Sequence, residues 1–347
     1  DVFAGKKSAQ IREILISESA WEEMTCLFAP SLNIFDGDGV TSHKVSVSRL
    51  LEDNTSLYNQ PTARFSNEHN VTSRQSGKEW LIELPYFLRE DLIVPADIQG
   101  KRKPGSDIQE TVTDIYSDYM NKHAIAFMRT RESYLARSLF SGQVYTPKTD
   151  DLLIDFGDLF GVAPMNATLD LSATDSSTLR AIDDMVSQIT EAAQSQASAV
   201  ERIIVFATGS FYSDLRFSPA MEAAFRYVSP LDEGNVVFQR RDLLPGVSTF
   251  SIPGSNVDVI KVTDPLLIAQ MGDADAIAIP QFAKGSGIYT NIYGAASSTF
   301  ELLNAAPAEV YSWSFESERG NAINVISENS ALSVNHGLGF SVHIKAA

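Results

Sequence analysis

One long segment of the sequence contains almost no residues that could build a core, and it lies between two predicted strands. It spans residues 58–80 and reads YNQPTARFSNEHNVTSRQSGKEW. Residues 43–50 before it alternate apolar and polar side chains, and residues 80–87 after it are mostly apolar, as in strands. A compact domain rarely contains a structureless connection of this length, and such connections are usually functional or disordered. The chain must therefore adopt a fold that accommodates this segment, like the tip of a very long hairpin.

The charge of this segment differs in sign from that of the whole chain. The formal net charge of the chain is -17. The segment is slightly basic, with charges at Arg64, Glu68, Arg74, Lys78 and Glu79. This contrast favours docking onto an acidic surface. A solvated flexible loop is the alternative that these residues leave open.

The composition is that of a globular protein with ample material for a core. Of the 347 residues, 44% are hydrophobic and 20% are charged. This length exceeds the size at which a single core usually stops growing, so two lobes are expected. The net charge of -17 disfavours general electrostatic binding to nucleic acid or to an anionic membrane. No apolar run has the length of a membrane span, and no signal-peptide pattern is present.

The longest helix signal lies between residues 106 and 142. Ser106 and Gln109 form a capping-box pattern, and apolar residues follow at intervals of three and four up to Gly142. A helix of this length would span roughly 50 Å and must lie across a sheet or against a partner. Its charges suit the helix macrodipole, with acidic residues in the first half and basic residues in the second: Asp107, Glu110, Asp114 and Asp118, then Arg129, Arg131 and Arg137.

The remaining pattern predicts helices packed on a mixed sheet together with a strand-rich second lobe, which is an α+β fold. Residues 8–28 read as an amphipathic arm, and residues 35–42, FDGDGVTS, as a Gly/Asp turn. Helices are predicted at 176–196 and, as two short helices meeting near Pro219, at 210–228. Strands are predicted at 202–207, 275–280, 309–318, 321–329 and 337–344, with a strand and turn at 151–162 and a hairpin at 247–262.

No arrangement of residues predicts a catalytic, cofactor or metal site. The five histidines lack metal-ligand spacing, and no G-x-S-x-G, H-E-x-x-H or paired-cysteine motif occurs. Asp36 and Asp38 resemble the start of a calcium loop, but the glycine falls at the wrong place. Residues 284–289, KGSGIY, are interpreted as a flexible loop rather than a phosphate cradle. The single cysteine, Cys26, excludes an intrachain disulfide and is interpreted as a small buried residue.

The order of the predicted parts resembles that of a known family. An N-terminal arm, a long two-stranded extension, one very long helix, a helix-decorated sheet lobe and a return to strands follow one another. The segments that carry the resemblance are HKVSVSRL, ELPYFLREDLIVPADI, FMRTRESYLARSLFSGQVYT, LLIDFG, RIIVFATGSFYSDLR, AIAIPQF, GIYTNIYG and SENSALSVNHGLGFSVHI. Taken in order, they are similar to the major capsid proteins of tailed bacteriophages, in particular the lambda-type capsid protein E family with the HK97-like fold.

The resemblance implies a division of the chain into the regions of that fold. Residues 1–43 would form an N-terminal arm, 44–90 the E-loop with its base strands, and 91–168 the peripheral (P) domain with a spine helix at about 106–142. Residues 169–305 would form the axial (A) domain, 306–335 strands of the P domain, and 336–347 a C-terminal strand of the A domain.

The resemblance also implies a structural function in a virion. Copies would self-assemble into hexamers and pentamers of an icosahedral phage head, formed through procapsid maturation, that encloses double-stranded DNA without sequence-specific binding. Assembly would take place in the host cytoplasm, with scaffold, protease, portal and cement proteins as candidate partners and no membrane. The alternatives are an encapsulin-like shell, another virion component and, further from the pattern, a soluble α/β enzyme.

In this interpretation, the core-poor segment finds its stabilising contacts on the next subunit. Its predicted interface residues are three cations that would meet an acidic surface and two aromatic anchors: Arg64, Arg74, Lys78, Phe65 and Trp80. The acidic residues expected to receive the cations are Asp114 and Asp118, in the first half of a neighbouring spine helix.

Overall fold

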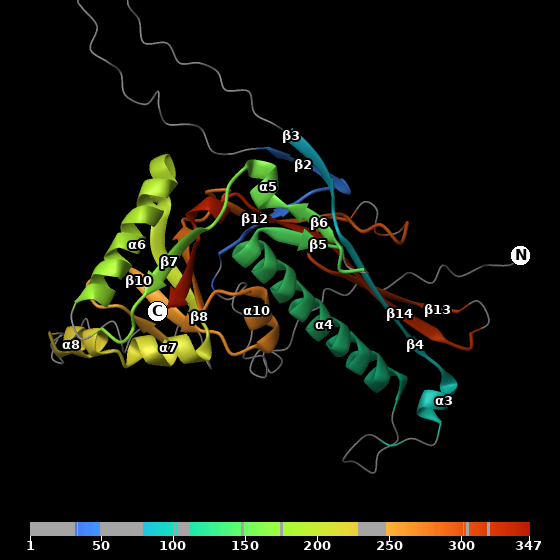
Figure 1. Cartoon of the computed structure of the whole chain (residues 1–347). Helices are drawn as coiled ribbons and strands as arrows, with labels where there is room; N and C mark the ends of the chain where they lie inside the picture. Colours follow the sequence, from blue (N-terminus) through green and yellow to red (C-terminus); the bar gives the residue numbers. More distant parts are fainter. Residues whose placement is uncertain are drawn as a thin grey trace, which may run out of the picture.

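Two β-sheets and one long helix organise the part of the molecule that the structure describes (Figure 1). The computed structural model describes residues 34–48, 79–99, 111–146, 149–173, 176–227, 248–300, 305–317 and 320–347, together with Leu32, Arg102 and Leu302. A six-stranded sheet with its helices forms one lobe, and a five-stranded sheet forms the other. The predicted α+β class is confirmed.

The six-stranded sheet has helices on both faces. In spatial order its strands are β7 (Met165–Leu169), β15 (Val342–Ala346), β11 (Ala276–Phe282), β8 (Val200–Ala207), β10 (Val257–Lys261) and β9 (Thr249–Ser251). Every residue of β11 is buried. A strand covered on both faces reads as a continuous apolar run, and the buried strands predicted at 202–207 and 275–280 are confirmed as β8 and β11.

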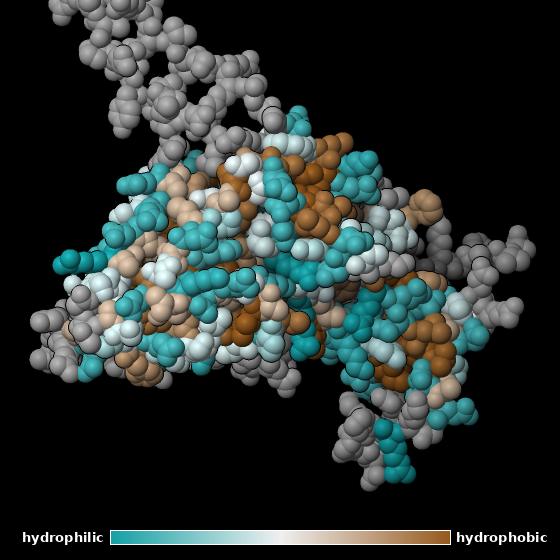
Figure 2. Space-filling view, in the orientation of Figure 1, coloured by the Kyte–Doolittle hydropathy of each residue, from teal (hydrophilic) through white to brown (hydrophobic). Residues whose placement is uncertain are grey.

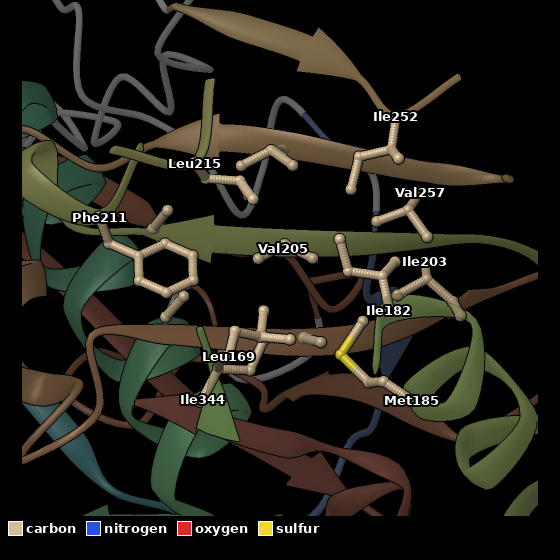
Figure 3. Close-up of a cluster of buried hydrophobic side chains, with 14 of the residues drawn as sticks. Leu169, Ile182, Met185, Ile203, Val205, Phe211, Leu215, Ile252, Val257 and Ile344 are labelled. Carbon is tan, nitrogen blue, oxygen red and sulfur yellow. The ribbon is translucent and has the colours of Figure 1, made fainter. Parts of the chain in front are cut away.

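Three helices cover one face of this sheet: α6 (Ser177–Ala193), α7 (Gly209–Arg216) and α8 (Pro219–Tyr227). Figure 3 shows Ile182 and Met185 of α6 in one apolar cluster with Ile203 of β8. Fully burying a side chain of this size contributes roughly 1.5–3 kcal/mol. The amphipathic helix predicted at 176–196 and the pair of helices meeting near Pro219 are confirmed.

The opposite face of the six-stranded sheet packs against α10 (Pro265–Gln270) and the C-terminal half of the long helix α4. The rings of Phe206 in β8 and Phe140 in α4 lie edge to face, with centroids 5.2 Å apart. Leu32 and Ile34 are buried in the same cluster. The end of the predicted N-terminal arm is therefore anchored in this core, and residues 1–31, including Cys26, lie outside the described residues.

The five-stranded sheet is centred on the long strand β14 (Ile323–Asn335). Along its first part β14 pairs with β4 (Tyr86–Ile93) and with β13 (Tyr311–Glu316). Along its last part it pairs with β12 (Tyr289–Tyr293). The predicted return to strands at the C-terminal end is confirmed, and only the last strand, β15, crosses to the other sheet.

The turn predicted at residues 35–42 is wrong for its first half, because Asp36–Gly39 form strand β1. This strand pairs in parallel with β12 at the edge of the five-stranded sheet. A Cβ at Gly39 would lie 2.8 Å from Pro307 and 3.0 Å from the ring of Tyr293, so the close approach requires glycine. Pairing with a strand about 250 residues away overrode the local turn preference.

Helix α4 spans Val112–Ser141 and begins later than the predicted position near Ser106. Its N-cap is Thr111, whose extended backbone (φ -106°, ψ 160°) ends the helical geometry there. Ser106 and Gln109 lie outside the described residues. The predicted C-terminal end is confirmed: Gly142 adopts φ 69°, a left-handed conformation that favours glycine.

Two short ladders complete the five-stranded lobe: β2 (Lys44–Ser48) with β3 (Glu79–Glu83), and β5 (Gln143–Tyr145) with β6 (Leu152–Asp155). The strand predicted at 80–87 is interrupted at Pro85, between β3 and β4. Asp155 caps a short helix, α5 (Phe156–Phe160), where a turn is predicted, and α3 (Pro95–Ile98) follows β4. Within the described residues, two 3₁₀ helices are present, η2 (Gln194–Ala199) and η4 (Leu338–Phe340).

Candidate functional site: a subunit interface

The ladder of β2 and β3 is the base from which the core-poor segment leaves the body of the protein. Its last residue pair is Ser48 and Glu79. Residues 49–78 therefore leave and return at the same end of the ladder. The four predicted interface residues within this segment lie outside the described residues: Arg64, Phe65, Arg74 and Lys78.

The ladder has one buried face and one exposed face. Val47 and Ile82 belong to a buried cluster together with the aromatic side chains of α5. Leu81, on the opposite face, is 71% exposed. Leu152 and Leu153 of β6 are also exposed. Figure 2 shows apolar surface in the upper part of the molecule, over the region that β5 and β6 occupy in Figure 1. Apolar surface of this kind is typical of contact sites between proteins.

Trp80, predicted to be an apolar anchor on the next subunit, packs within its own chain. It is half-buried, and its ring lies edge-on to Phe160 of α5 with centroids 5.7 Å apart. An aromatic pair in this arrangement contributes about 0.5–1.5 kcal/mol beyond its buried area. Trp80 therefore helps to hold the ladder on its own subunit, and its contact with a second copy stays a prediction.

The two acidic residues predicted to receive the segment lie one turn apart on α4. The carboxylate of Asp114 accepts hydrogen bonds from the backbone N–H of Thr111 at 3.1 Å and from its hydroxyl at 2.7 Å. The backbone N–H of Asp114 in turn donates to the Thr111 hydroxyl oxygen at 3.2 Å, which completes a capping box at the helix N-terminus. Asp118 is exposed, and its spacing places it on the same helix face as Asp114. Asp118 is therefore the more accessible carboxylate for a second copy.

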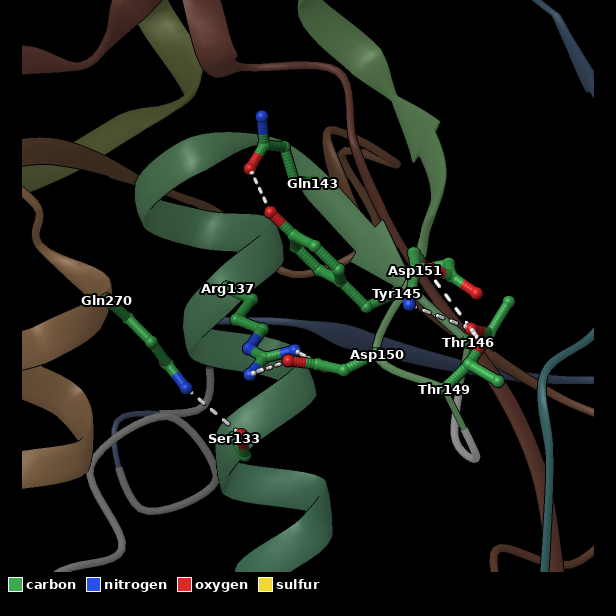
Figure 4. A network of polar contacts seen from close by, with 9 residues as sticks. All are labelled: Ser133, Arg137, Gln143, Tyr145, Thr146, Thr149, Asp150, Asp151 and Gln270. Carbon is green, nitrogen blue, oxygen red and sulfur yellow. Dashed lines mark hydrogen bonds and ion pairs between the residues drawn. The ribbon is translucent and has the colours of Figure 1, made fainter.

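Basic residues in the second half of α4 make contacts inside the subunit. Arg131 pairs with Glu309 at 2.8 Å. Arg137 donates to Asp150 at 2.5 Å, and its guanidinium lies over the ring of Tyr145, 4.7 Å from the centroid (Figure 4). The hydrogen bond from Arg137 lowers the pKa of the Asp150 carboxyl. These arginines therefore fix the β5–β6 connection and the residues before β13 against the helix.

A buried network that the sequence did not predict joins α4 to the five-stranded sheet. The side chain of His123 is fully buried, with Nε2 2.6 Å from Asp91 Oδ2 and Nδ1 2.8 Å from the Ser327 hydroxyl oxygen. Because an ionised carboxylate can only accept, we assign the hydrogen to Nε2, which donates to Asp91, while Nδ1 accepts from Ser327. Because the Ser327 hydroxyl donates its hydrogen bond to His123, its oxygen is left to accept a hydrogen bond from the Ser312 hydroxyl at 2.8 Å. Burial lowers the pKa of His123, although the hydrogen bond with Asp91 opposes this shift.

The order serine, histidine, aspartate occurs in hydrolases, but here it has a structural role. Ser327 and His123 are both fully buried, so a substrate has no access to the hydroxyl. The network instead satisfies polar groups beneath α4. Asp91 and His123 are 32 residues apart in sequence, and His123 and Ser327 are 204 apart, so no local motif could have indicated the network.

The described residues contain no group of three or more histidine, cysteine or acidic side chains that could hold a metal ion. Asp36, which resembles the first residue of a calcium loop in the sequence, accepts a hydrogen bond from the backbone N–H of Gly285 at 2.9 Å. That bond joins β1 to residues 284–289, the stretch interpreted as a loop. Among the described helices, none is both long and apolar enough to cross a membrane.

Comparison with known proteins identifies one family. The model of the family described as phage major capsid protein E matches residues 27–346. The major capsid protein of Pseudomonas phage KPP10 is 21% identical over 320 residues, which is 87% of each chain.

Solved capsid structures are similar at low sequence identity. The capsid of an empty GTA particle is 12% identical with a TM-score of 0.48, covering 99% of this chain and 94% of that one. The capsid of cyanophage P-SCSP1u is 11% identical with a TM-score of 0.46, covering 100% of this chain and 92% of that one.

The family match spans nearly the whole chain, from the last residues of the predicted arm through β15. It therefore includes the ladder, the long helix and both sheets. The chain belongs to the phage major capsid protein E family, and it is a structural protein of a tailed-phage head, located in the virion capsid, rather than an enzyme.

Proposed function

We propose that copies of this chain assemble into the head by laying residues 49–78 of each copy on the next copy. The observation that carries the proposal is the position of the ladder. The segment follows Ser48 and ends before Glu79, and these two residues form the last pair of the β2–β3 ladder. One face of this ladder is buried against α5, which fixes it to the body of the subunit. A segment with few core-forming residues gains little from its own subunit and more from a neighbour's surface. Repeated around a ring, such contacts would form hexamers and pentamers of an icosahedral shell around double-stranded DNA.

The regions of the HK97-like fold are proposed with the boundaries given by the sequence. The arrangement of the sheets supports the assignment of the last three strands. It differs from the boundaries at two strands: β12, within 169–305, belongs to the five-stranded sheet, and β7, which begins within 91–168, belongs to the six-stranded sheet. The strands at 311–316 and 323–335 belong to the five-stranded sheet, which would be the P domain, together with β4. The last strand, at 342–346, belongs to the six-stranded sheet, which would be the A domain. The long helix α4, the proposed spine, contributes to the cores of both.

Charge supports the proposed contact between copies. The segment carries Arg64, Arg74 and Lys78, whereas the chain as a whole has a net charge of -17. Asp118 is exposed on α4, and Asp114 already accepts hydrogen bonds at the helix N-terminus. We therefore expect Asp118 to be the principal acidic partner on α4. The same net charge would keep a shell from binding the packaged DNA tightly, if the acidic groups face inward.

Assembly of charge-reversed variants tests this proposal. The double variant Arg74→Glu with Lys78→Glu should remain a folded subunit by circular dichroism but yield few shells by electron microscopy and sedimentation. The matched control reverses two exposed lysines elsewhere, Lys284→Glu with Lys345→Glu, so the net charge changes equally. Normal shell yield from the first pair, alongside shells from the wild-type chain, would remove the proposed charge contact. A wild-type chain that stays monomeric under all assembly conditions would contradict the proposed function itself.

A further inference from the structure

Leu32 and residues 34–40 form a strap that contacts both lobes. Its first part belongs to the six-stranded lobe, where Leu32 and Ile34 are buried in the cluster on the α4 side of the sheet. Its last part belongs to the five-stranded lobe, where β1 pairs in parallel with β12 and the N–H of Val40 donates to the Tyr293 carbonyl at 2.9 Å. In Figure 1 it is the blue trace that leads to the strand beside β12. The strap is therefore attached to one lobe at each end.

Between its ends, the strap lies beside the connection that carries the chain from β11 to β12. This connection contains Gly285 and Gly287 at φ 80° and 69°, in the left-handed region that favours glycine. Asp36 of the strap accepts a hydrogen bond from the N–H of Gly285 at 2.9 Å. The ring centroids of Phe35 and Tyr289 lie 5.8 Å apart. The strap therefore braces a connection whose glycines have much conformational freedom of their own.

A row of polar side chains crosses the six-stranded sheet and ends at the strap. Four adjacent strands contribute one side chain each, on the face that turns toward α4: Ser251 of β9, Asp258 of β10, Arg202 of β8 and Gln281 of β11. The Ser251 hydroxyl donates to Asp258 at 2.5 Å. Arg202 donates from Nη1 to Asp258 at 3.1 Å and from Nε to Gln281 Oε1 at 2.6 Å. Gln281 Nε2 then donates to the Leu32 carbonyl at 3.1 Å, so the row holds the strap by its backbone.

The orientation of the Gln281 amide follows from its neighbour Arg202. A guanidinium has only donors, so the amide oxygen faces Arg202 and the NH₂ group faces Leu32. Gln281 is 8% exposed, and both of its polar atoms have a partner, as a buried amide requires. Because the acceptor is a backbone carbonyl, this bond fixes the path of the chain whatever side chains the strap carries.

We propose that the strap fixes the angle between the two lobes, and that Gln281 is the clamp that holds its end in the six-stranded lobe. The other end is held by the ladder with β12, where a Cβ at Gly39 would lie 2.8 Å from Pro307. Helix α4 also contributes to both cores, so release of the strap should loosen the angle without separating the lobes. This inference goes beyond the proposed function, because it concerns the shape of one subunit rather than a contact between copies.

Hydrogen exchange tests the clamp. Gln281→Glu keeps the length of the side chain and the acceptor for Arg202, but it places a carboxylate oxygen where an N–H donated to Leu32. The amides of residues 36–40 should exchange about tenfold faster, whereas those of β8 should keep their protection. Gln188→Glu makes the same charge change at an exposed position on α6 and should leave both sets of amides unchanged. Unchanged exchange at residues 36–40 in Gln281→Glu would overturn the clamp.

Distances between spin labels on the isolated subunit test the angle between the lobes. In a Cys26→Ser background, Asp184→Cys on α6 and Glu90→Cys on β4 place one label on an exposed site of each lobe. The distance distribution should be narrow in this labelled chain and should broaden when Gln281→Glu is added. Gly39→Ala releases the opposite end of the strap without a buried charge, so it should broaden the distribution in the same way. Faster exchange of the strap with no broadening would show that other contacts fix the lobes, and it would overturn the inference.

Discussion

The two lobes bury their interiors with different chemistry. In the six-stranded lobe, β8 alternates Ile203 and Val205 toward one core with Ile204 and Phe206 toward the other. Beneath α4 in the five-stranded lobe, the buried side chains include a polar set beside the apolar cluster of Ile93, Ile115 and Val325. The polar set is His123, Ser138, Ser327, Asn329, Ser333 and Asn335. One lobe is held by close apolar packing on both faces of its sheet, and the other combines smaller apolar clusters with hydrogen bonds between a helix and a strand.

These polar contacts are specific in geometry. The Ser138 hydroxyl donates to the Ser333 carbonyl at 3.0 Å, and the side chain of Asn335 donates to the Ser138 carbonyl at 2.7 Å. A satisfied hydrogen bond contributes only about 0.5–1.5 kcal/mol net, whereas a lost partner for a buried group costs about 1–3 kcal/mol. The six-stranded lobe should therefore supply most of the stability of the subunit. The five-stranded lobe also carries the ladder with the exposed Leu81, so it should gain most from contacts with neighbouring copies.

The largest expected effect is the loss of an aromatic ring from the apolar lobe. Phe206→Ala should lower the free energy of unfolding by about 3–5 kcal/mol, because it leaves a cavity between β8 and α4. Phe206 is 1% exposed, and the matched control Phe217→Ala removes a ring that is 76% exposed. Denaturant unfolding of both variants measures the difference. A cost near that of the control would show that this core is not the main source of stability.

The next effect is a pH dependence located in the polar lobe. His336 stacks on Phe160 with ring centroids 5.0 Å apart, and burial lowers its pKa to about 4. Because the unfolded pKa is near 6.5, protonation favours the unfolded state, so stability is intact above pH 6.5 and falls as pH drops toward 4. This group alone should account for a loss of about 3 kcal/mol across that range. His123, whose pKa is also lowered, acts in the same direction.

Hydrogen exchange at pH 7 and pH 5 locates this effect. Protection in β14 and α4 should fall more than protection in β8 and β11. The variant His336→Phe keeps a stacking ring and removes the titrating group, so it should flatten most of the pH dependence. An unchanged pH profile in that variant would assign the acid sensitivity to another group.

A smaller effect is expected from one hydrogen bond of the polar interface. Asn335→Ala removes the donor to the carbonyls of Ser138 and Leu139, at 2.7 Å and 3.4 Å. The subunit should lose about 1–3 kcal/mol, because the carbonyls stay buried without this partner. Ser172→Ala, which removes an exposed hydroxyl bonded to Asp170, is the control and should change stability by less than about 0.5 kcal/mol. A small loss in both would mean that water or a helix shift replaces the bond.

The sequence predicted the apolar lobe better than the polar one, and the reason is physical. Apolar periodicity is local, so it indicated α6, β8, β11 and the helices around Pro219 directly. The interface beneath α4 depends on side chains such as Asp91, His123 and Ser327 that meet only in the folded chain. The serines and asparagines of this interface are residue types that usually occur in loops and on the surface, so nothing in the sequence indicated that they are buried.

Two local errors have different causes. The strand at Asp36–Gly39 could not be predicted because its glycines are required by a distant tyrosine and proline. The start of α4 could have been found, since Thr111 and Asp114 also form a capping-box pattern and lie closer to the apolar repeat than Ser106 does. Of the predicted interface, the structure describes Trp80, Asp114 and Asp118, and it assigns the first two contacts within their own chain.

The smallest effect on stability separates a folding residue from an assembly residue. Asp114→Ala removes the capping carboxylate and should cost about 0.5–2 kcal/mol. Asp118→Ala, one turn later on the same face, should cost less than about 0.5 kcal/mol because its side chain is exposed. Thermal unfolding of the two isolated subunits measures this difference.

Shell assembly should depend on the charge of Asp118. Asp118→Lys should reduce shell yield without changing subunit stability, because it would repel Arg74 and Lys78 of a second copy. The swap should be reciprocal: Asp118→Lys combined with Arg74→Glu and Lys78→Glu should assemble better than either set alone. Rescue of shell yield by the combined variant would support an interaction between Asp118 and these cations in the assembled shell. If the combined variant assembles no better than the variant Arg74→Glu with Lys78→Glu, these two cations bind elsewhere on the second copy.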